Sequence, residues 1–287
     1  MEVGGGQGGA GEIGRLAASS LTFGGLPLEP ALEALRELGC TAVELAAHEG
    51  WAHVDPSTLA DDPERVAATA AAVGRTGLRV VALNAGLRTP DPDTARRQAG
   101  ALADLALRLG ARVLTLPAGR DLRAATAWLA PLLATVQARG VTLAVETHIG
   151  ALTESPAAAV ALCQDLPGLR LTLDPSHYWA GPAQGRGWEA VLPLVAHLHL
   201  RDAGRGGWAQ IQMAPGTGAV DFAQVLAGLR LAGYSGALAA EYIDRIPIPG
   251  GTTAADATVA MLARARHWLE TGVWPAGADP GADGSPR

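Results

Sequence analysis

The chain has 287 residues, 48% of them hydrophobic, and a formal net charge of −6. No basic run occurs, which argues against nucleic acid as a partner. The chain contains no lysine, because all 22 formal cations are arginines; this excludes Schiff-base chemistry, pyridoxal phosphate attachment and P-loop phosphate binding.

Residues 1–14, MEVGGGQGGAGEIG, lack the charged-then-apolar layout of a signal peptide and are expected to form a flexible, Gly-rich leader. The two cysteines, Cys40 and Cys163, do not form a zinc-type pair. No apolar stretch has transmembrane length. These features favour a cytoplasmic protein without a membrane partner.

From residue 15 onward, short apolar runs alternate with longer Ala-, Leu- and Arg-rich helical stretches. Three of the helices end on glycine before the next strand, in LRELGC, LRLGAR and QARGVT. The predicted strands are Arg15–Ser20, Thr41–Ala46, Arg79–Asn84, Arg112–Leu116, Val141–Thr147, Arg170–Asp174, Ala196–Arg201 and Ala237–Tyr242. The predicted helices are Glu29–Leu38, Asp62–Thr76, Asp93–Leu109, Ala124–Arg139, Pro156–Gln164, Trp188–Leu194, Phe222–Ala232 and Thr253–Glu270.

Eight strand-then-helix units in strict alternation predict parallel strands with right-handed crossovers. Eight such units that close on themselves form a (β/α)₈ TIM barrel, an α/β fold. The alternative, a doubly wound open sheet that binds a dinucleotide, lacks the G-x-G-x-x-G after the first strand. We therefore expect one catalytic barrel domain at residues 15–274 and a disordered, Pro/Gly/Asp-rich tail at residues 275–287.

The last four predicted strands each carry a metal-capable side chain near their C-terminal ends, where barrel enzymes place their chemistry. Three carboxylates do not converge stably without a cation. Three oxygen donors and one imidazole suit one divalent ion, with Mn²⁺ preferred and Mg²⁺, Co²⁺ or Zn²⁺ as alternatives. Each residue alone could instead be a helix cap or a salt-bridge partner. The four residues are Glu146, Asp174, His199 and Glu241.

Side chains alternate across a strand, so His148 and Arg201 are expected one layer nearer solvent than the metal ligands, where a substrate would lie. His197 is expected one layer deeper. Glu44, near the end of the second strand, is read either as a substrate contact or as the partner of an arginine.

Tryptophans fall in three of the loops expected at the catalytic end of the barrel. Trp51, Trp179 and Trp208 could stack on the C–H faces of a sugar or pack in the core. Trp179 is included among the predicted substrate contacts.

Five stretches together resemble the xylose isomerase-like TIM barrel superfamily, which includes the sugar phosphate isomerase/epimerase family. These stretches are AVETH, LTLDPSHYWAG, VAHLHLRD, APGTGAVDF and LAAEYI, and the resemblance covers residues 15–270. It implies that Glu146, Asp174, His199 and Glu241 bind one divalent metal and that His177 and Arg201 contact the substrate. The resemblance is also compatible with a homo-oligomer.

The resemblance implies a small sugar or polyol ketone as substrate. One of the two glutamates, Glu146 and Glu241, would remove the proton α to the carbonyl, giving a metal-stabilised enediolate, and the other would return it. We therefore predict a ketose isomerase or epimerase. The alternative is a dehydratase or lyase of a keto-sugar or keto-inositol, of the inosose dehydratase, dehydroshikimate dehydratase or 3-keto-glycoside eliminase type.

The superfamily also includes endonucleases, which use three zinc ions and need further histidines after strands three, four and seven. Here strands three and four end in ALNAG and TLPAG, and residues 203–222 contain no histidine. This departure, together with the negative charge, disfavours DNA repair.

Overall fold

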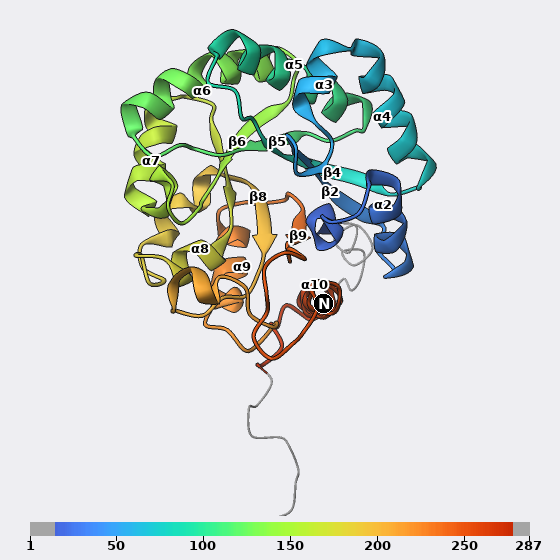
Figure 1. The fold of residues 1–287 in the computed structure, drawn as a ribbon. Helices are drawn as coiled ribbons and strands as arrows, with labels where there is room; N and C mark the ends of the chain where they lie inside the picture. Colours follow the sequence, from blue (N-terminus) through green and yellow to red (C-terminus); the bar gives the residue numbers. More distant parts are fainter. Residues whose placement is uncertain (1–14, 278–287) are drawn as a thin grey trace, which may run out of the picture.

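The computed structural model describes residues 15–277. The expected leader at residues 1–14 and residues 278–287 of the expected tail lie outside this range. Eight parallel strands follow one another around a closed barrel, with pairing between the first and second strands completing the ring. The prediction of a single (β/α)₈ barrel is confirmed, and Figure 1 shows the helices arranged around the central strands.

The barrel strands run in chain order apart from one short addition. The barrel strands are β1 (Leu16–Ser19), β2 (Ala42–His48), β4 (Arg79–Gly86), β5 (Val113–Leu116), β6 (Thr142–Glu146), β7 (Arg170–Leu173), β8 (Val195–Leu200) and β9 (Leu238–Ala240). The addition, β3 (Ala52–His53), pairs antiparallel with the end of β2. β2 ends at His48, two residues beyond the predicted end at Ala46.

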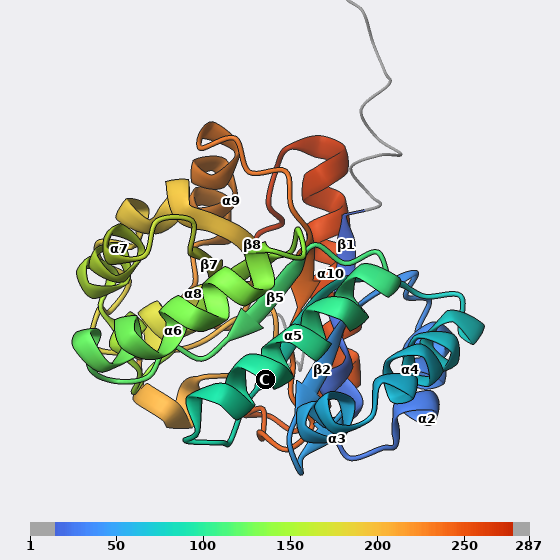
Figure 2. The same cartoon turned by 90° about the horizontal axis from the view of Figure 1, so that it is seen from above.

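The outer layer consists mainly of long helices, seen from above in Figure 2. The helices are α2 (Leu28–Glu37), α3 (Pro56–Asp61), α4 (Pro63–Arg75), α5 (Pro92–Arg108), α6 (Leu122–Gln137), α7 (Pro156–Asp165), α8 (Pro175–Ala180), α9 (Phe222–Leu231) and α10 (Ala254–Thr271). Short 3₁₀ helices cover Ser20–Phe23, Leu152–Glu154, Trp188–Leu194 and Gly207–Gln210.

Local sequence signals explain where the helices begin and end. Side chains of Asp62, Asp91 and Asp121 accept first-turn N–H groups of α4, α5 and α6, which satisfies donors that lack an intrahelical partner. The glycines predicted to follow three helices, Gly39, Gly110 and Gly140, have φ of 82°, 75° and 73°. This left-handed conformation is readily accessible to glycine and stops a helix before the next strand.

Three features depart from the sequence-based assignment. The predicted helix at Trp188–Leu194 is a short 3₁₀ helix that contains Pro193. The segment after β2 holds β3 and α3, which were not predicted. The segment after Asp174, expected to be a loop, forms α8.

The start of the expected tail lies against the barrel. Arg264 donates from Nη1 to the carbonyl oxygens of Pro275 and Ala276 at 3.0 and 3.1 Å. Within residues 15–277, no helix is long and apolar enough to cross a membrane.

Candidate metal centre and active-site cavity

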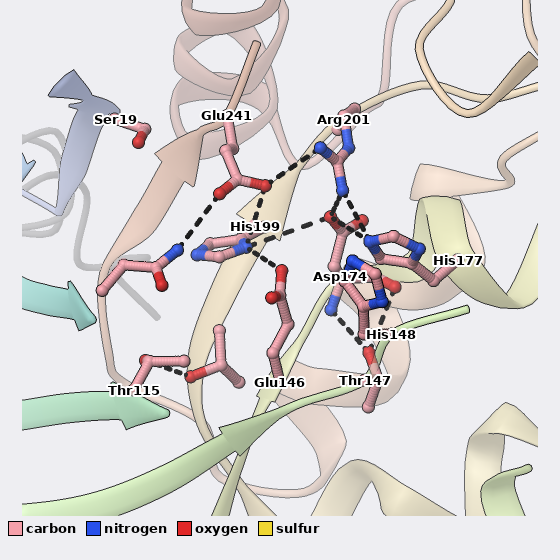
Figure 3. A network of polar contacts seen from close by, with 12 residues as sticks. Ser19, Thr115, Glu146, Thr147, His148, Asp174, His177, His199, Arg201 and Glu241 are labelled. Atoms are coloured by element: carbon pink, nitrogen blue, oxygen red, sulfur yellow. Dashed lines mark hydrogen bonds and ion pairs between the residues drawn. The ribbon is translucent and has the colours of Figure 1, made fainter. Parts of the chain in front are cut away.

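The four predicted metal-capable side chains converge at the C-terminal end of the barrel. Glu146 is the last residue of β6, Asp174 follows β7, and Glu241 follows β9. His199 lies within β8. Each offers one ligand atom, and the four atoms lie within 4.8 Å of one another. Figure 3 shows the side chains directed toward a common point from four neighbouring strands.

The Nδ1 atom of His199 lies at the centre of this group. It is 3.2 Å from Glu146 Oε1 and 3.3 Å from Glu241 Oε2. It is 3.9 Å from Asp174 Oδ2. Burial opposes a positive charge on His199, but the carboxylates of Glu241 and Glu44 outweigh it and raise the pKa of the imidazole well above its ordinary value.

A buried arginine links two of the carboxylates. Arg201 forms an ion pair from Nη2 with Asp174 Oδ2, and its Nη1 lies 3.2 Å from Glu241 Oε2. Its Nε donates to Ser176 Oγ at 3.0 Å. Its Nη2 also lies 2.8 Å from His177 Nε2. The guanidinium therefore offsets part of the carboxylate charge and is held in place on several sides.

Asp174 performs two tasks with its two oxygens. Oδ1 accepts the Ser176 N–H at 2.9 Å and caps α8, while Oδ2 faces Arg201 and His199. Burial raises the pKa of Asp174 to about 6, against the opposing effect of Arg201. The helix-cap and metal-ligand readings of this residue are therefore compatible, because each uses a different oxygen.

The second ring nitrogen of His199, Nε2, points deeper into the barrel than Nδ1. His199 Nε2 lies 2.9 Å from Glu44 Oε1, and His197 Nε2 lies 3.0 Å from the same oxygen. Burial opposes ionisation of Glu44, yet the charges of His199 and His197 hold its pKa below the ordinary value. The three residues form a second group capable of holding a metal, sharing His199 with the first.

A cavity of about 280 Å³ opens above the carboxylates. Glu146 and Glu241 line it, whereas the carboxylate of Asp174 is fully buried beside it. Its wall also carries Trp51 and Trp208, of which Trp208 is 54% exposed. The cavity thus has a charged floor and a partly aromatic wall, a combination typical of small-molecule sites.

Of the five predicted substrate contacts, two line the cavity and a third lies directly behind it. Arg201 and His148 line the cavity. His177 lies behind them, with its ring centroid 4.1 Å from that of His148, and its Nδ1 accepts the Ile149 N–H at 3.1 Å. It supports cavity residues rather than forming part of the wall.

The structure places the other two predicted contacts, Glu44 and Trp179, away from the cavity. Glu44 lies in the middle of β2 because that strand continues to His48, so its carboxylate points into the barrel interior and not into the mouth. Trp179 belongs to α8 and packs in the core against Trp188, with ring centroids 5.8 Å apart. Neither lines the cavity.

Two cavity residues were not singled out from the sequence. Asn84 donates from Nδ2 to Glu241 Oε1 at 3.2 Å. Its position as a polar residue near the C-terminal end of β4 is the sequence feature that could have identified it. His48 lies at the end of β2 beside Trp51, with ring centroids 4.8 Å apart. Its Nε2 is buried and has no hydrogen-bond partner within the described residues.

The fold and the cluster define a class, a single TIM barrel with a buried group of residues able to hold a metal at the catalytic end. The sequence matches the family model described as xylose isomerase-like TIM barrel over residues 32–265. The chain belongs to that family. No curated protein matches the sequence.

Solved structures confirm the shared fold at low identity. A xylose isomerase-like TIM barrel protein from Mycobacterium smegmatis, in complex with magnesium, is 17% identical with a TM-score of 0.71, covering 89% of this chain and 96% of that one. D-allulose 3-epimerase from Methylomonas sp. is 16% identical with a TM-score of 0.65, covering 90% and 98%. The probable 3-DHS dehydratase AsbF from Bacillus anthracis is 14% identical with a TM-score of 0.64, covering 87% and 97%.

Proposed function

We propose that this chain is a divalent-metal-dependent isomerase or epimerase of a ketose or related polyol ketone. The observation that carries the proposal is the position of two glutamates. Glu146 and Glu241 belong to the metal-capable cluster and also line the cavity. Two carboxylates that approach one substrate space from different strands can exchange a proton with it from two directions.

The donor set fits a divalent ion. Glu146, Asp174 and Glu241 offer carboxylate oxygens and His199 offers a nitrogen. Among the described residues, the buried Glu241 Oε2 has ion-pair contacts with Arg201 and His199 but no contact with hydrogen-bond geometry. Such a set suits Mn²⁺ first, with Mg²⁺, Co²⁺ or Zn²⁺ as alternatives. When bound there, the ion would polarise the substrate carbonyl and stabilise negative charge on its oxygen.

The protein's own groups account for the proton transfers. One of Glu146 and Glu241 removes the proton from the carbon next to the carbonyl, and the other returns a proton from the opposite face, which inverts that carbon. Return to the neighbouring carbon instead gives aldose–ketose isomerisation. Arg201, beside Glu241 at the floor, is positioned to orient a hydroxyl of the substrate, and His148 also lines the cavity.

The neighbouring structures support this assignment only as a class. They include a sugar 3-epimerase and a probable dehydratase. Removal of the α-proton is the first step of epimerisation, isomerisation and dehydration alike, so the fate of the substrate after that step distinguishes them.

The test is to incubate Mn²⁺-loaded protein in D₂O with a panel of ketoses, keto-inositols and 3-keto-glycosides, followed by proton NMR and mass analysis. We expect deuterium at one carbon and an isomer of unchanged composition. Loss of one water, or of an aglycone, would reassign the protein as a dehydratase or lyase. Absence of exchange across the panel, in protein shown to bind Mn²⁺, would contradict the proposal.

A further inference from the structure

His199 has an unusual position between two groups of charged side chains. Its Nδ1 faces Glu146, Asp174 and Glu241. Its Nε2 faces Glu44, which comes from β2 on a different part of the barrel. We call Glu146, Asp174 and Glu241 with His199 the outer group, and Glu44 and His197 with His199 the inner group. The two groups share the His199 ring, and each contacts a different ring nitrogen.

A metal at Nδ1 would require the neutral form of the His199 ring, and a neutral imidazole has one N–H donor and one lone pair. The Glu44 carboxylate, 2.9 Å from His199 Nε2, favours the tautomer in which Nε2 carries the proton and donates a hydrogen bond to it. The lone pair is then on Nδ1, the atom that faces the three outer carboxylates. A carboxylate that holds the second nitrogen of a metal-binding histidine fixes its tautomer and orientation and raises its basicity.

We infer that Glu44 is a positioning residue that reserves His199 Nδ1 for the metal and that His197 holds Glu44 in this role. The inference deepens the proposed function, because it rests on a divalent ion bound by the outer group. It also assigns the inner group, Glu44 and His197, a purpose other than binding a second ion.

A second ion at the inner group is disfavoured by the chemistry of the shared ring. Ions on both sides would require lone pairs on both nitrogens of His199, and the ring would have to lose its last N–H proton. The inner group offers only three ligand atoms and is sealed, with Glu44, His197 and His199 at most 1% exposed. One ion per chain is therefore expected.

His197 completes the arrangement from the same strand as His199. Its Nε2 is 3.0 Å from Glu44 Oε1, although the contact lacks hydrogen-bond geometry. The two imidazole rings are perpendicular, with centroids 5.3 Å apart. Since Glu44 Oε2 has no hydrogen-bond partner within residues 15–277, the carboxylate depends on these two rings to compensate its buried charge.

The test compares Glu44→Ala and Glu44→Gln with the unchanged protein. Calorimetric titration with Mn²⁺ measures affinity and stoichiometry, and thermal unfolding checks that each variant folds. We expect one ion per unchanged chain, and about 10–100-fold weaker binding in Glu44→Ala. Glu44→Gln retains an oxygen that can accept the Nε2 proton, so part of the affinity should be recovered.

A matched control lies in the same barrel interior. Thr115 and Thr172 are buried and hydrogen bonded to each other at 2.7 Å, and they belong to neither group. The double variant Thr115→Val/Thr172→Val should bind Mn²⁺ as the unchanged protein does. Equal weakening there would mean that any disturbance of the interior lowers affinity, which would overturn the specific role of Glu44.

A spectroscopic readout keeps the inference testable if Glu44→Ala does not fold. Nitrogen-15 NMR of the Mg²⁺-loaded, unchanged protein should show His199 protonated at Nε2, and a proton at Nδ1 would overturn the inference. Unchanged affinity in both Glu44 variants, or two ions per unchanged chain with one lost in Glu44→Ala, would also overturn it. If the unchanged chain binds no ion, the proposed function fails together with the inference.

Discussion

The two arcs of the barrel differ at the same, C-terminal end. The arc from β6 to β9 supplies Glu146, Asp174, His199 and Glu241 in succession. The arc from β1 to β5 supplies mostly apolar or aromatic wall, including Leu21, Trp51 and Pro117, with His48 and Asn84 as uncharged or titratable polar exceptions and no carboxylate. The charged side chains of the cavity therefore lie on one side of the barrel, and the other side contributes mainly uncharged wall.

The strongest test of this division is removal of one of the two glutamates proposed to transfer the proton. Glu146→Gln and Glu241→Gln should each lower the rate of solvent deuterium incorporation by about 10²–10⁴-fold, because an amide cannot accept the α-proton. The measurement uses the substrate that exchanges with the unchanged protein. The exposed Glu189 provides a control, since Glu189→Gln should exchange normally. A normal rate in either cavity variant would remove that residue from the mechanism.

Arg201 tests how the charged arc is held together. In Arg201→Ala, Asp174 and Glu241 lose a buried cationic partner, so the free energy of unfolding without metal should fall by about 3–5 kcal/mol. Mn²⁺ should reduce this loss, because it compensates the same carboxylates. Urea unfolding with chelator and with Mn²⁺ measures both values, and the exposed Arg186 gives the control Arg186→Ala. Equal destabilisation in both conditions would argue against metal at this group.

Asn84 tests whether the less charged arc contributes to chemistry. Its hydrogen bond to Glu241 involves a charged acceptor, for which removal typically costs about 1.5–3 kcal/mol. Asn84→Ala should therefore lower the exchange rate by about tenfold or more, less than replacement of Glu241 itself. Deuterium incorporation over time gives the comparison. A rate equal to that of the unchanged protein would confine the chemistry to the β6–β9 arc.

The smallest effect on activity is expected from the aromatic wall. Trp208→Ala should raise KM a few-fold, consistent with about 0.5–1.5 kcal/mol for an aromatic contact, and leave kcat nearly unchanged. Trp179→Ala is the contrast, because this core residue is only 4% exposed. That variant should lose about 3–5 kcal/mol of folding free energy and retain the KM of the unchanged protein. A raised KM in Trp179→Ala, together with lost stability and unchanged KM in Trp208→Ala, would contradict these roles.

The sequence predicts much of this molecule because strand alternation and strand ends are local signals. Four strands in register bring Glu146, Asp174, His199 and Glu241 together, and the alternation of side chains places His197 below His199. No distant contact has to be known for either conclusion, since parallel strands of a barrel share one catalytic end.

The remaining features depend on packing that no local pattern contains. The length of β2 decides that Glu44 lies inside the barrel, and its pairing with β4 shifts register between Val43 and Glu44. The turn after Asp174 forms α8, which carries Trp179 into the core. The role of Asn84 appears only when β4 and Glu241 are placed side by side.

The central claim is that a single divalent ion is bound on the β6–β9 arc. Anomalous diffraction from crystals soaked in Mn²⁺ tests it directly. We predict one peak per chain, about 2.0–2.6 Å from oxygens of Glu146, Asp174 and Glu241 and bonded to His199 Nδ1. A peak between Glu44 and His197, or no peak at the outer carboxylates in crystals of protein that binds Mn²⁺ in solution, would contradict the claim.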